Sequence, residues 1–576
     1  MSASVGAGTL VWFRKGLRLH DNRALSAALQ RSGKLVYPVF VLDPWFLHPS
    51  KVGPNRIRFL LESLSDLDRG LERDLGTRLI VLRGNPAETL AEAAKDWNCG
   101  MCCYEKDTEP YAKERDAKVD KALGEVGCST ESSPGHTLWD MDDLLLACSG
   151  KAPQTMTSFL ALAKKVGDPG VPLPSPKGLS LAAPPPPFSF DASKHGVPEM
   201  ADLPHYAEAS KGEADSKAKC PFRGGETEGL ERLRTLGGVG RGDAYIRGFS
   251  KPDTSPTCPT QPSTTALSPY LKFGCVSPRA VYQRLTEAEG KGAQTQPPVS
   301  LMGQLYWREH FYLLGHQMGG SFGRMHGSPI SKQIPWERNA ALVRAWKEAR
   351  TGFPWIDACM VQLREQGWMH HLGRHAVACF LTRGDLWQHW EEGAAVFDEL
   401  LLDADWSLNS ANWMWLSCSA FFAQYFRVYG PHSFAKKTDP SGAYVRHFLP
   451  ALRGMPDKYI YEPWKAPAEV QRKARCIVGV DYPFPLVDHA DASKANIDKL
   501  KLAYAASKDG TGPDHDVAAK VTHENDTAVA TAPGVVQYTP GVRVMPNGGT
   551  TSGASSPGDA GTLAGLFSKA PKQVKL

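Results

Sequence analysis

Short apolar runs alternate with amphipathic segments along the first 130 residues. The runs TLVWF, LVYPVFVL, RLIVL and MCCY are typical of buried parallel strands, and RIRFLLESLSDLDRGLERDL has helical periodicity. This order predicts an open α/β domain, a type that binds ligands at the carboxyl ends of its strands. No GxGxxG motif follows the first strand, which argues against a nicotinamide dinucleotide.

The pattern changes further along the chain. Residues 141–225 are rich in Pro, Gly, Ser and Ala, including LAAPPPPFSF, and predict a long linker over the surface. Residues 226–505 hold long segments of 3.6-residue periodicity, which predict a second, all-α domain. Residues 506–576 contain too little apolar surface to offset their chain entropy, so we expect a disordered extension. Its terminal TLAGLFSKAPKQVKL is either a fraying end or a docking peptide for a partner protein.

Composition narrows the class of protein. The chain has 576 residues and a mean hydropathy of -0.33, and no apolar run reaches the roughly 20 residues that span a bilayer. Only MSASVGAG precedes TLVWF, which is too short for a signal peptide, so we expect a nuclear or cytoplasmic protein. The 12 cysteines are scattered, which argues against a disulfide framework. Cys99, Cys102 and Cys103 lack a second ligand pair, and no metal site is predicted.

The net charge is only +5, but basic residues gather between positions 420 and 480. They outnumber the acids there and are Arg427, Lys436, Lys437, Arg446, Arg453, Lys458, Lys465, Arg472, Lys473 and Arg475. A solvated surface and a phosphate-binding face both explain such a run, and both alternatives stay open.

Ten of the 15 tryptophans lie between residues 307 and 415, where aromatic density usually means core filling. In LLDADWSLNSANWMW, however, a helix would place Asp405, Asn409 and Trp413 in one line. Asp403 would lie just outside this helix, near its start, where an acid is also favoured as a cap. A buried polar row must be hydrogen-bonded or charge-paired, and a flat heteroaromatic ligand would satisfy it.

Three histidines lie in the apolar stretch GWMHHLGRHAVACF. His371 and His375 share one helical face, whereas His370 points about 100° away. The HxxxH pair lacks the glutamate of HExxH and a third ligand, which argues against zinc. Two satisfied core histidines remain one explanation, and acid–base chemistry near neutral pH is the other.

Several long motifs, together with TLVWFRKGLRLHDN, resemble the photolyase/cryptochrome flavoproteins. They are FGCVSPR, GQLYWREHFY, TGFPWIDACM, GWMHHLGRHAVACFLTRGDLW, LLDADWSLN and WMWLSCSAFF. The resemblance spans about residues 9–505 and is closest to eukaryotic (6-4) photolyases and animal-like cryptochromes. It implies a Rossmann-like antenna domain with a five-stranded parallel sheet over residues 1–140 and an all-helical domain that binds FAD. The antenna domain would bind a second chromophore, either 8-hydroxy-deazaflavin or methenyltetrahydrofolate.

The resemblance also implies roles for individual residues. The residues that would bind FAD are Ser268, Gln304, Arg308, His371, Arg374, Asp403, Ala404, Asp405 and Asn409, with Arg374 paired to Asp403. Electrons would reach the photoexcited flavin through Trp413, Trp390 and Trp336, with Trp387 as a fourth member one helical turn before Trp390. A flipped-out DNA lesion would contact Lys251, Gln304, Trp307, Trp415 and Tyr429.

The residues at positions 371 and 375 indicate which DNA lesion the protein would repair. By resemblance, photolyases for cyclobutane dimers carry Asn in place of His371 and Met in place of His375. Repair of a (6-4) photoproduct moves an oxygen between two bases, which a proton donor assists. His371 is therefore predicted to donate the proton, and His375 to orient and tune it. Met369 and Gly373 depart from the family pattern of a larger or β-branched aliphatic residue and Ala, and Gly373 would loosen the helix by up to about 1 kcal/mol.

The function expected from these residues is blue-light-driven repair of (6-4) pyrimidine-pyrimidone photoproducts in UV-damaged DNA. A blue-light photoreceptor or transcriptional regulator, with a regulatory protein bound through the C-terminal extension, is the alternative. One chain can combine both functions. We expect a nuclear monomer that has no membrane association.

Overall fold

The computed structural model describes residues 8–211, 220–236, 238, 241–256, 263–289 and 292–508. Most of the predicted disordered extension, from residue 509 onward, lies outside the described residues. Residues 506–508 instead end helix α23 (His489–Lys508). No helix in the described ranges is long and apolar enough to cross a bilayer.

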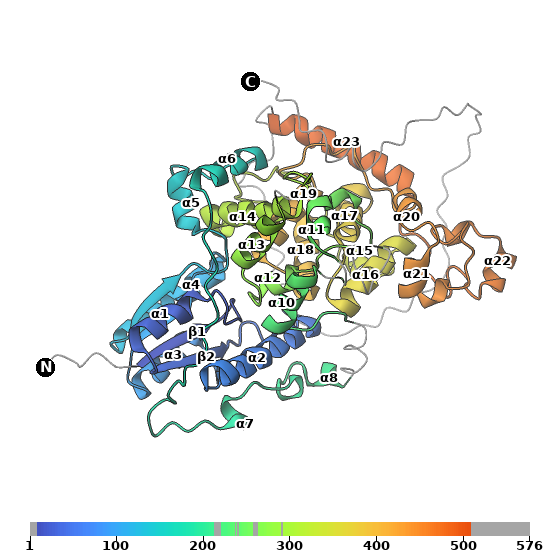
Figure 1. The fold of residues 1–576 in the computed structure, drawn as a ribbon. Coiled ribbons are helices and arrows are strands. Elements are labelled where there is room, and N and C mark those ends of the chain that lie inside the picture. The colour runs from blue at the N-terminus through green and yellow to red at the C-terminus, as the bar shows by residue number, and fades with distance from the viewer. Residues whose placement is uncertain are drawn as a thin grey trace, which may run out of the picture.

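The N-terminal part of the chain forms a parallel five-stranded sheet in the order β3-β2-β1-β4-β5, which confirms the predicted α/β fold (Figure 1). Its strands are β1 (Gly8–Phe13), β2 (Val36–Leu42), β3 (Ile80–Arg83), β4 (Cys99–Glu105) and β5 (Ser129–Ser133). The helices that follow the first four strands are α1 (Arg23–Ser32), α2 (Pro54–Leu75), α3 (Pro86–Asp96) and α4 (Pro110–Glu125). Because β1 and β2 are buried on both faces, their sequences are continuously apolar.

Part of the predicted linker is helical. Helices α5 (Met141–Ala147) and α6 (Met156–Val166) pack against α14 (Leu301–Met318) of the helical domain. Beyond them the chain, as far as it is described to residue 211, runs along the outside of the α/β domain and forms the short helices α7 (Ala192–His195) and α8 (Ala207–Ser210) with a 3-10 turn at Met200–Asp202 between them. The Pro-rich composition thus predicts the extended part of the linker and not its helical beginning.

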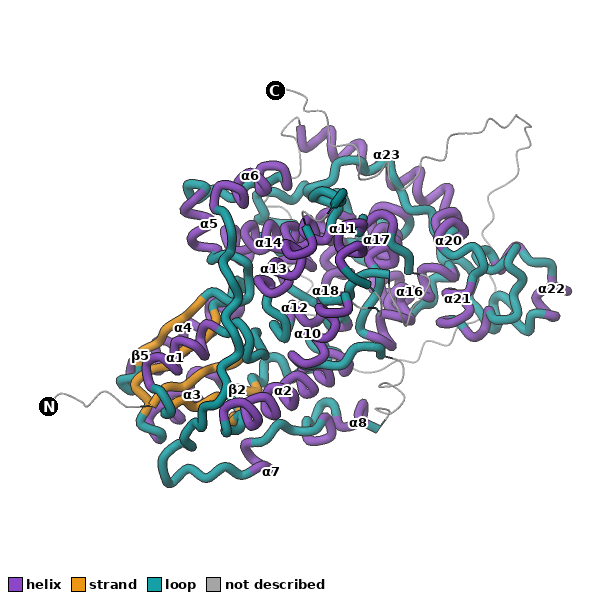
Figure 2. The backbone as a smooth tube through the Cα atoms, in the orientation of Figure 1, coloured by secondary structure: helices purple, strands orange, loops and turns teal. Residues whose placement is uncertain are grey.

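The second domain is helical, as predicted, and Figure 2 shows strands only in the N-terminal domain. Helices up to residue 366 are α10 (Glu226–Thr235), α11 (Asp243–Gly248), α12 (Ser268–Lys272), α13 (Pro278–Ala288), α14, α15 (Ala340–Lys347) and α16 (Pro354–Gln366). The later ones are α17 (His371–Cys379), α18 (Trp390–Leu400), α19 (Trp406–Leu416), α20 (Ser433–Thr438), α21 (Ala443–Phe448), α22 (Ala468–Lys473) and α23.

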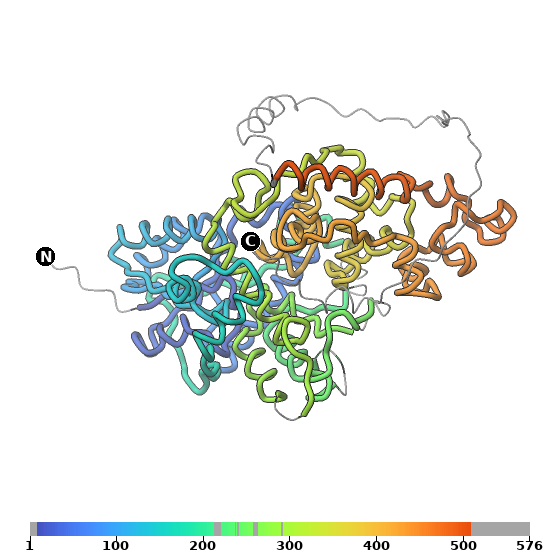
Figure 3. Tube along the Cα trace, turned by 90° about the horizontal axis from the view of Figure 1, so that it is seen from above, coloured from blue at the N-terminus to red at the C-terminus, as the bar shows by residue number. Residues whose placement is uncertain are grey.

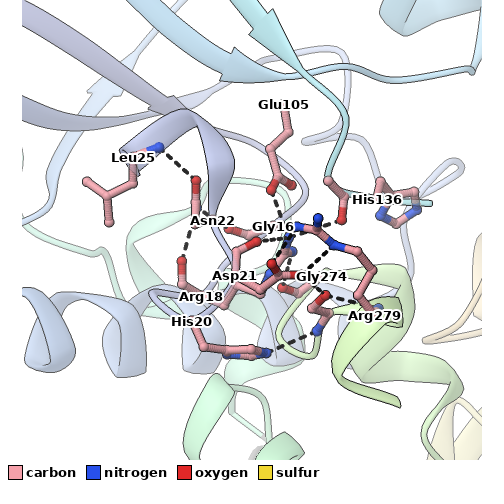
Figure 4. A network of polar contacts seen from close by, with 12 residues as sticks. Gly16, Arg18, His20, Asp21, Asn22, Leu25, Glu105, His136, Gly274 and Arg279 are labelled. Atoms are coloured by element: carbon pink, nitrogen blue, oxygen red, sulfur yellow. Dashed lines mark hydrogen bonds and ion pairs between the residues drawn. The ribbon is translucent and has the colours of Figure 1, made fainter. Parts of the chain in front are cut away.

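A buried polar network joins the two domains (Figure 4). Arg18 is fully buried and donates to the carbonyl of Gly274 at 2.9 Å and to Glu105 at 2.7 Å. Arg279 of α13 forms an ion pair with Asp21, which is also fully buried. Such buried charges are stable only when they are paired, so the network fixes the relative position of the domains.

Candidate functional site

Two adjoining cavities of about 290 Å³ each lie within the helical domain. They share several lining residues, among them Ser268, Gln304, Arg374 and Asp403, and therefore form two lobes of one site, here called the double cavity. The first lobe also contains Lys272, Arg308 and Asp405. The second lobe also contains Lys251, His371, His375, Ala404, Asn409 and Trp413. Every residue predicted to bind FAD thus lines the double cavity.

Asp405 is the N-cap of α19, and its carboxylate accepts from the backbone N–H of Leu408 at 3.3 Å. The interpretation of Asp405 as a residue inside the helix, with Asp403 as its cap, was wrong. The second carboxylate oxygen accepts from the hydroxyl of Tyr312 and lies 3.8 Å from Nε2 of His136. Burial opposes ionisation of Asp405, but the nearby His136 side chain and the charge of Lys15 outweigh it and lower its pKa. The site therefore holds a fixed negative charge at neutral pH.

The ion pair predicted between Arg374 and Asp403 is present and bidentate. Two guanidinium nitrogens of Arg374 lie 3.0 and 2.8 Å from the two carboxylate oxygens of Asp403. The third, Nε, donates to the carbonyl of Met369 at 2.8 Å. Because all three contacts are planar and directional, they hold α17 against the segment that precedes α19.

Cations surround the first lobe. Arg308 donates to Glu309 and to the carbonyl of His136, each at 2.7 Å, and its neighbour Glu309 is fully buried. Burial, followed by the charges of Arg56 and Lys15, lowers the pKa of Lys272 to about 8. An anionic group placed in this lobe would favour the charged form of Lys272 and raise its pKa again. The sequence analysis missed Lys272, although it lies four residues after Ser268 on the same short helix, and it missed His136, which has no motif around it.

The histidines lie at the start of α17. His370 is the N-cap and accepts from the N–H of Leu372 at 3.2 Å, while His371 and His375 have ring centroids 5.5 Å apart. Nδ1 of His375 lies 3.3 Å from the hydroxyl of Tyr429. Burial, followed by the charge of Lys251, lowers the pKa of His375 to about 3. Burial and neighbouring histidine and lysine groups also hold the pKa of His371 well below its usual value. Both rings are therefore neutral at pH 7.

Two family descriptions match the chain: "DNA photolyase" over residues 9–177 and "FAD binding domain of DNA photolyase" over residues 301–502. The chain is 48% identical to a (6-4)DNA photolyase of Oryza sativa subsp. japonica over 89% of this chain and 93% of that protein. It is 44% identical to cryptochrome-1 of Rattus norvegicus over 96% of this chain and 91% of that protein. The chain belongs to the photolyase/cryptochrome family.

Solved structures of family members have the same fold. The Synechocystis cryptochrome aligns with a TM-score of 0.74 at 27% identity and covers 86% of this chain and 99% of its own. A bacterial class III photolyase from Agrobacterium tumefaciens aligns with a TM-score of 0.71 at 29% identity, covering 88% of this chain and 99% of its own. These alignments include both domains.

The double cavity fits the FAD of this family of flavoproteins. Lys272 forms no ion pair within the described part of the chain and its pKa is lowered, so it suits a diphosphate, while Arg308 in the same lobe is already paired with Glu309. Leucine side chains of α10, α12 and α13 give the first lobe apolar walls that suit a flat ring. In the second lobe, the amide of Asn409 is held by a 2.9 Å hydrogen bond to the carbonyl of Ala394.

Of the four tryptophans predicted to carry electrons in this photolyase/cryptochrome fold, one lines the double cavity and two others contact each other, and the electron path itself stays a prediction. Trp413 lines the second lobe and Trp390, the first residue of α18, is fully buried. Trp336 and Trp387 are in contact, with ring centroids 4.5 Å apart. The prediction that Trp387 precedes Trp390 by one helical turn was wrong, because Trp387 lies before α18 with a φ of +56°.

The predicted lesion-contacting residues divide into two groups. Lys251 and Gln304 line the second lobe, and Tyr429 contacts His375 as described above. Trp307 and Trp415 contact each other edge to face, with centroids 5.2 Å apart, and are not among the lining residues of the double cavity. The sequence alone could not separate these groups, since the division depends on how α14 and α19 pack.

The basic run between residues 420 and 480 is partly neutralised. Lys436 and Lys465 pair with Glu462, and two further pairs join Arg446 to Asp457 and Lys473 to Glu469. The exposed basic residues that form no ion pair within the described part of the chain are Lys437, Arg453, Lys458, Arg472 and Arg475. A phosphate-binding face therefore stays a prediction, now restricted to these positions.

The carboxyl ends of β1 and β4 meet where an α/β domain binds its ligand. Lys15 lies there and pairs with Glu109 at 2.7 Å and with Asp107 at 3.1 Å. The choice between a deazaflavin and a folate as antenna chromophore stays a prediction. The described residues contain no group of three His, Cys, Asp or Glu side chains arranged for a metal ion.

Proposed function

We propose that the protein is a (6-4) DNA photolyase that uses blue light to repair pyrimidine-pyrimidone photoproducts. The observation that carries the proposal is the placement of His371 and His375, one helical turn apart, in the lobe that also contains Lys251 and Gln304. FAD, when bound, supplies the electron that light excites. The chain's own residues hold the lesion, exclude water and control a proton.

The proton is assigned to His371. Its Nε2 atom has no hydrogen-bond partner among the described residues, so this atom is the natural donor to a lesion oxygen. The negative charge of a bound phosphodiester would raise the pKa of His371 from its lowered value and favour the protonated ring. His375 is held by its contact with the hydroxyl of Tyr429, and we assign it the role of orienting His371.

Damaged DNA would be recognised by extrusion of the lesion into the second lobe. A distorted photoproduct stacks poorly, which lowers the free energy needed to flip it out of the duplex. Lys251 supports this role, because burial and the charge of Arg374 lower its pKa to about 8 and a phosphate would reverse that effect. Trp307, Trp415 and the exposed basic residues after position 430 would contact the flanking DNA. DNA as substrate favours a nuclear protein, and we propose a monomer.

A photoreceptor or transcriptional regulator is the second candidate. Support comes from α23, the last described element, which packs on Trp387 and leads into the C-terminal extension. Cryptochrome-1 proteins are also among the relatives. A regulatory partner would then bind through residues beyond 508.

The test uses FAD-loaded, chemically reduced protein and an oligonucleotide with one (6-4) photoproduct. We expect undamaged DNA to appear under blue light and not in darkness, as measured by chromatography of the digested oligonucleotide. An oligonucleotide with one cyclobutane dimer is the matched control and should remain unrepaired. Absence of repair by protein with bound, reducible FAD would contradict the photolyase proposal and favour the photoreceptor as the function.

A further inference from the structure

We propose that Lys251 is a nucleophile that forms an imine with the sugar of an abasic site in DNA and so gives the protein a light-independent strand-cleaving activity. The proposal rests on the extrusion of a damaged nucleotide into the second lobe that is proposed above. It assigns a second substrate to this lobe, namely a deoxyribose that has lost its base and carries an aldehyde at C1′ in its open form.

The backbone of Lys251 is held in place beside the second lobe. Its N–H donates to the carbonyl of Val299 at 3.0 Å, and the hydroxyl of Thr254 donates to its carbonyl at 2.8 Å. The next residue, Pro252, is buried. The side chain of Lys251 therefore lines the lobe from a fixed backbone position.

The amine of Lys251 has no anionic partner within the described part of the chain. Asp403 is the carboxylate that lines the second lobe, and both of its oxygens are already bonded to Arg374. Lys251 is thus buried next to a cation without a counter-charge. These are the conditions under which a lysine becomes a nucleophile toward carbonyl groups.

Burial and the charge of Arg374 lower the pKa of Lys251 to about 8. At pH 7 about 10% of this amine is uncharged, compared with roughly 0.04% of an exposed lysine. Contact with a phosphate would raise the pKa and slow the reaction without preventing it, because some uncharged amine stays in equilibrium. Only the uncharged amine attacks a carbonyl carbon, so Lys251 is far more reactive toward an aldehyde than a surface lysine.

Lys272 has a similar pKa but a different place in the double cavity. It lines the first lobe, where the diphosphate of FAD would restore its charge. Lys251 lines the second lobe together with His371 and His375. The reactive amine and two neutral imidazoles therefore share the lobe into which DNA damage would be extruded.

An abasic site suits this lobe. A nucleotide without a base has no stacking or pairing to lose, so its extrusion from the duplex needs less free energy than that of an intact nucleotide. It is also smaller than the two-base lesion proposed for the same lobe. Its open-chain aldehyde supplies the carbonyl group that an uncharged lysine attacks.

The reaction balances without an oxidant, a reductant or light. Nζ of Lys251 bonds to C1′, and the aldehyde oxygen leaves as water with both amine hydrogens. The imine, once protonated from solvent, withdraws electrons, so the neutral imidazole of His371 or His375 can accept a proton from C2′. A C2′–C3′ double bond forms, the C3′–O bond breaks, and the phosphate leaves with the electron pair. Water then hydrolyses the imine and frees Lys251.

The test incubates FAD-loaded protein in darkness with an end-labelled oligonucleotide that contains one abasic site. Sodium cyanoborohydride reduces an imine to a stable amine, and mass spectrometry of the digested adduct identifies the lysine. We expect the adduct on Lys251 and, without the reductant, cleavage of the strand on the 3′ side of the abasic site. Lys251→Arg keeps the charge but has no uncharged form at pH 7, so both products should fall at least about tenfold.

Lys121→Arg is the matched control and should react like the unchanged protein. Lys121 is an exposed residue of α4 in the α/β domain, which lies to one side of the helical domain (Figure 1 and Figure 3). Flavin absorbance checks that each variant is folded, and the position of the adduct in the unchanged protein does not depend on any variant.

An adduct on other lysines, equal products from Lys251→Arg, or an uncleaved strand would overturn the proposal. Light-driven repair by the same preparation separates the two functions. Repair of the (6-4) oligonucleotide without an adduct would overturn this proposal alone, whereas absence of both would also contradict the extrusion of DNA damage into the second lobe. An adduct on Lys251 with strand cleavage but without repair would support this proposal and contradict the photolyase.

Discussion

The side chain of Met369 occupies the space beside the backbone of Gly373. A Cβ atom on Gly373 would lie 2.9 Å from Cγ and 3.0 Å from Sδ of Met369, and 3.2 Å from Sγ of Cys359. These distances are shorter than ordinary contacts. The absence of a Cβ atom at Gly373 therefore leaves room for the side chain of Met369.

Replacement of Gly373 by Ala should destabilise the protein although Ala is the better helix former. The gain of up to about 1 kcal/mol in helix propensity is smaller than the roughly 1–3 kcal/mol that overpacking costs. Met369→Val in the same chain should recover most of the loss. Urea unfolding measures both effects, and a more stable Gly373→Ala single variant would show that Met369 moves aside freely.

Replacement of His371 by Ala should abolish repair and retain FAD. Loss of a proton donor lowers a rate by roughly a hundredfold or more. The comparison variant is His370→Asn, because Asn also caps a helix and His370 contacts the ring of His371 but is not among the residues that line the double cavity. Repair assays and flavin absorbance check the two variants. Retained repair in His371→Ala would remove the proton-donor role.

Stability should fall as the medium becomes acidic, partly because of His375. Its pKa is about 3 in the folded chain, below the value of about 6.5 of an unfolded chain, so the folded state binds fewer protons in this interval. The contribution of neutral His375 to the free energy of unfolding is complete above pH 6.5 and is lost progressively as the pH falls toward 3. Between pH 7.5 and 5.0 this loss is about 2 kcal/mol.

Replacing His375 by Gln should remove that part of the pH dependence. The measurement is urea unfolding of cofactor-free protein at pH 7.5 and 5.0. The difference between the two pH values should be about 2 kcal/mol smaller in the variant. An unchanged difference would indicate that the ring already takes up its proton in the folded chain.

Removal of one partner from the Arg374 and Asp403 ion pair should lower the free energy of unfolding. Asp403→Asn leaves a partly buried guanidinium without its carboxylate, which destabilises a protein by about 3 kcal/mol when the pair is buried. FAD should also dissociate more readily, because α17 loses its connection to the α19 side of the cavity. Unfolding and flavin release report the two effects. Arg374→Lys is the control for charge without bidentate geometry.

Replacement of Trp413 by Phe should slow photoreduction of the bound flavin. Repair by chemically reduced protein should continue, because that reaction needs no electron from the surface. Transient absorption and the oligonucleotide assay check the two expectations separately. Loss of both in a protein with altered near-ultraviolet circular dichroism would indicate a folding defect.

The sequence by itself determined the order of the domains and most of the site. Long apolar runs and 3.6-residue periodicity specify strands and helices locally, and the motif spacing places His371 and His375 on one helical face. The fifth strand, with the sequence STESS, was not visible in this way. It is an edge strand with little apolar surface, so only its pairing with β4 makes it a strand.

Tertiary structure decided the features that depend on distant segments. Asp405 became a cap because α19 begins at Trp406, and its charge is fixed by His136 and Lys15 from other parts of the chain. Lys499 reaches Trp387 only because α23 folds back over residues more than a hundred positions earlier. Local pattern reports which face of an element is apolar, whereas contacts between elements set burial, pairing and charge, and these decide the chemistry.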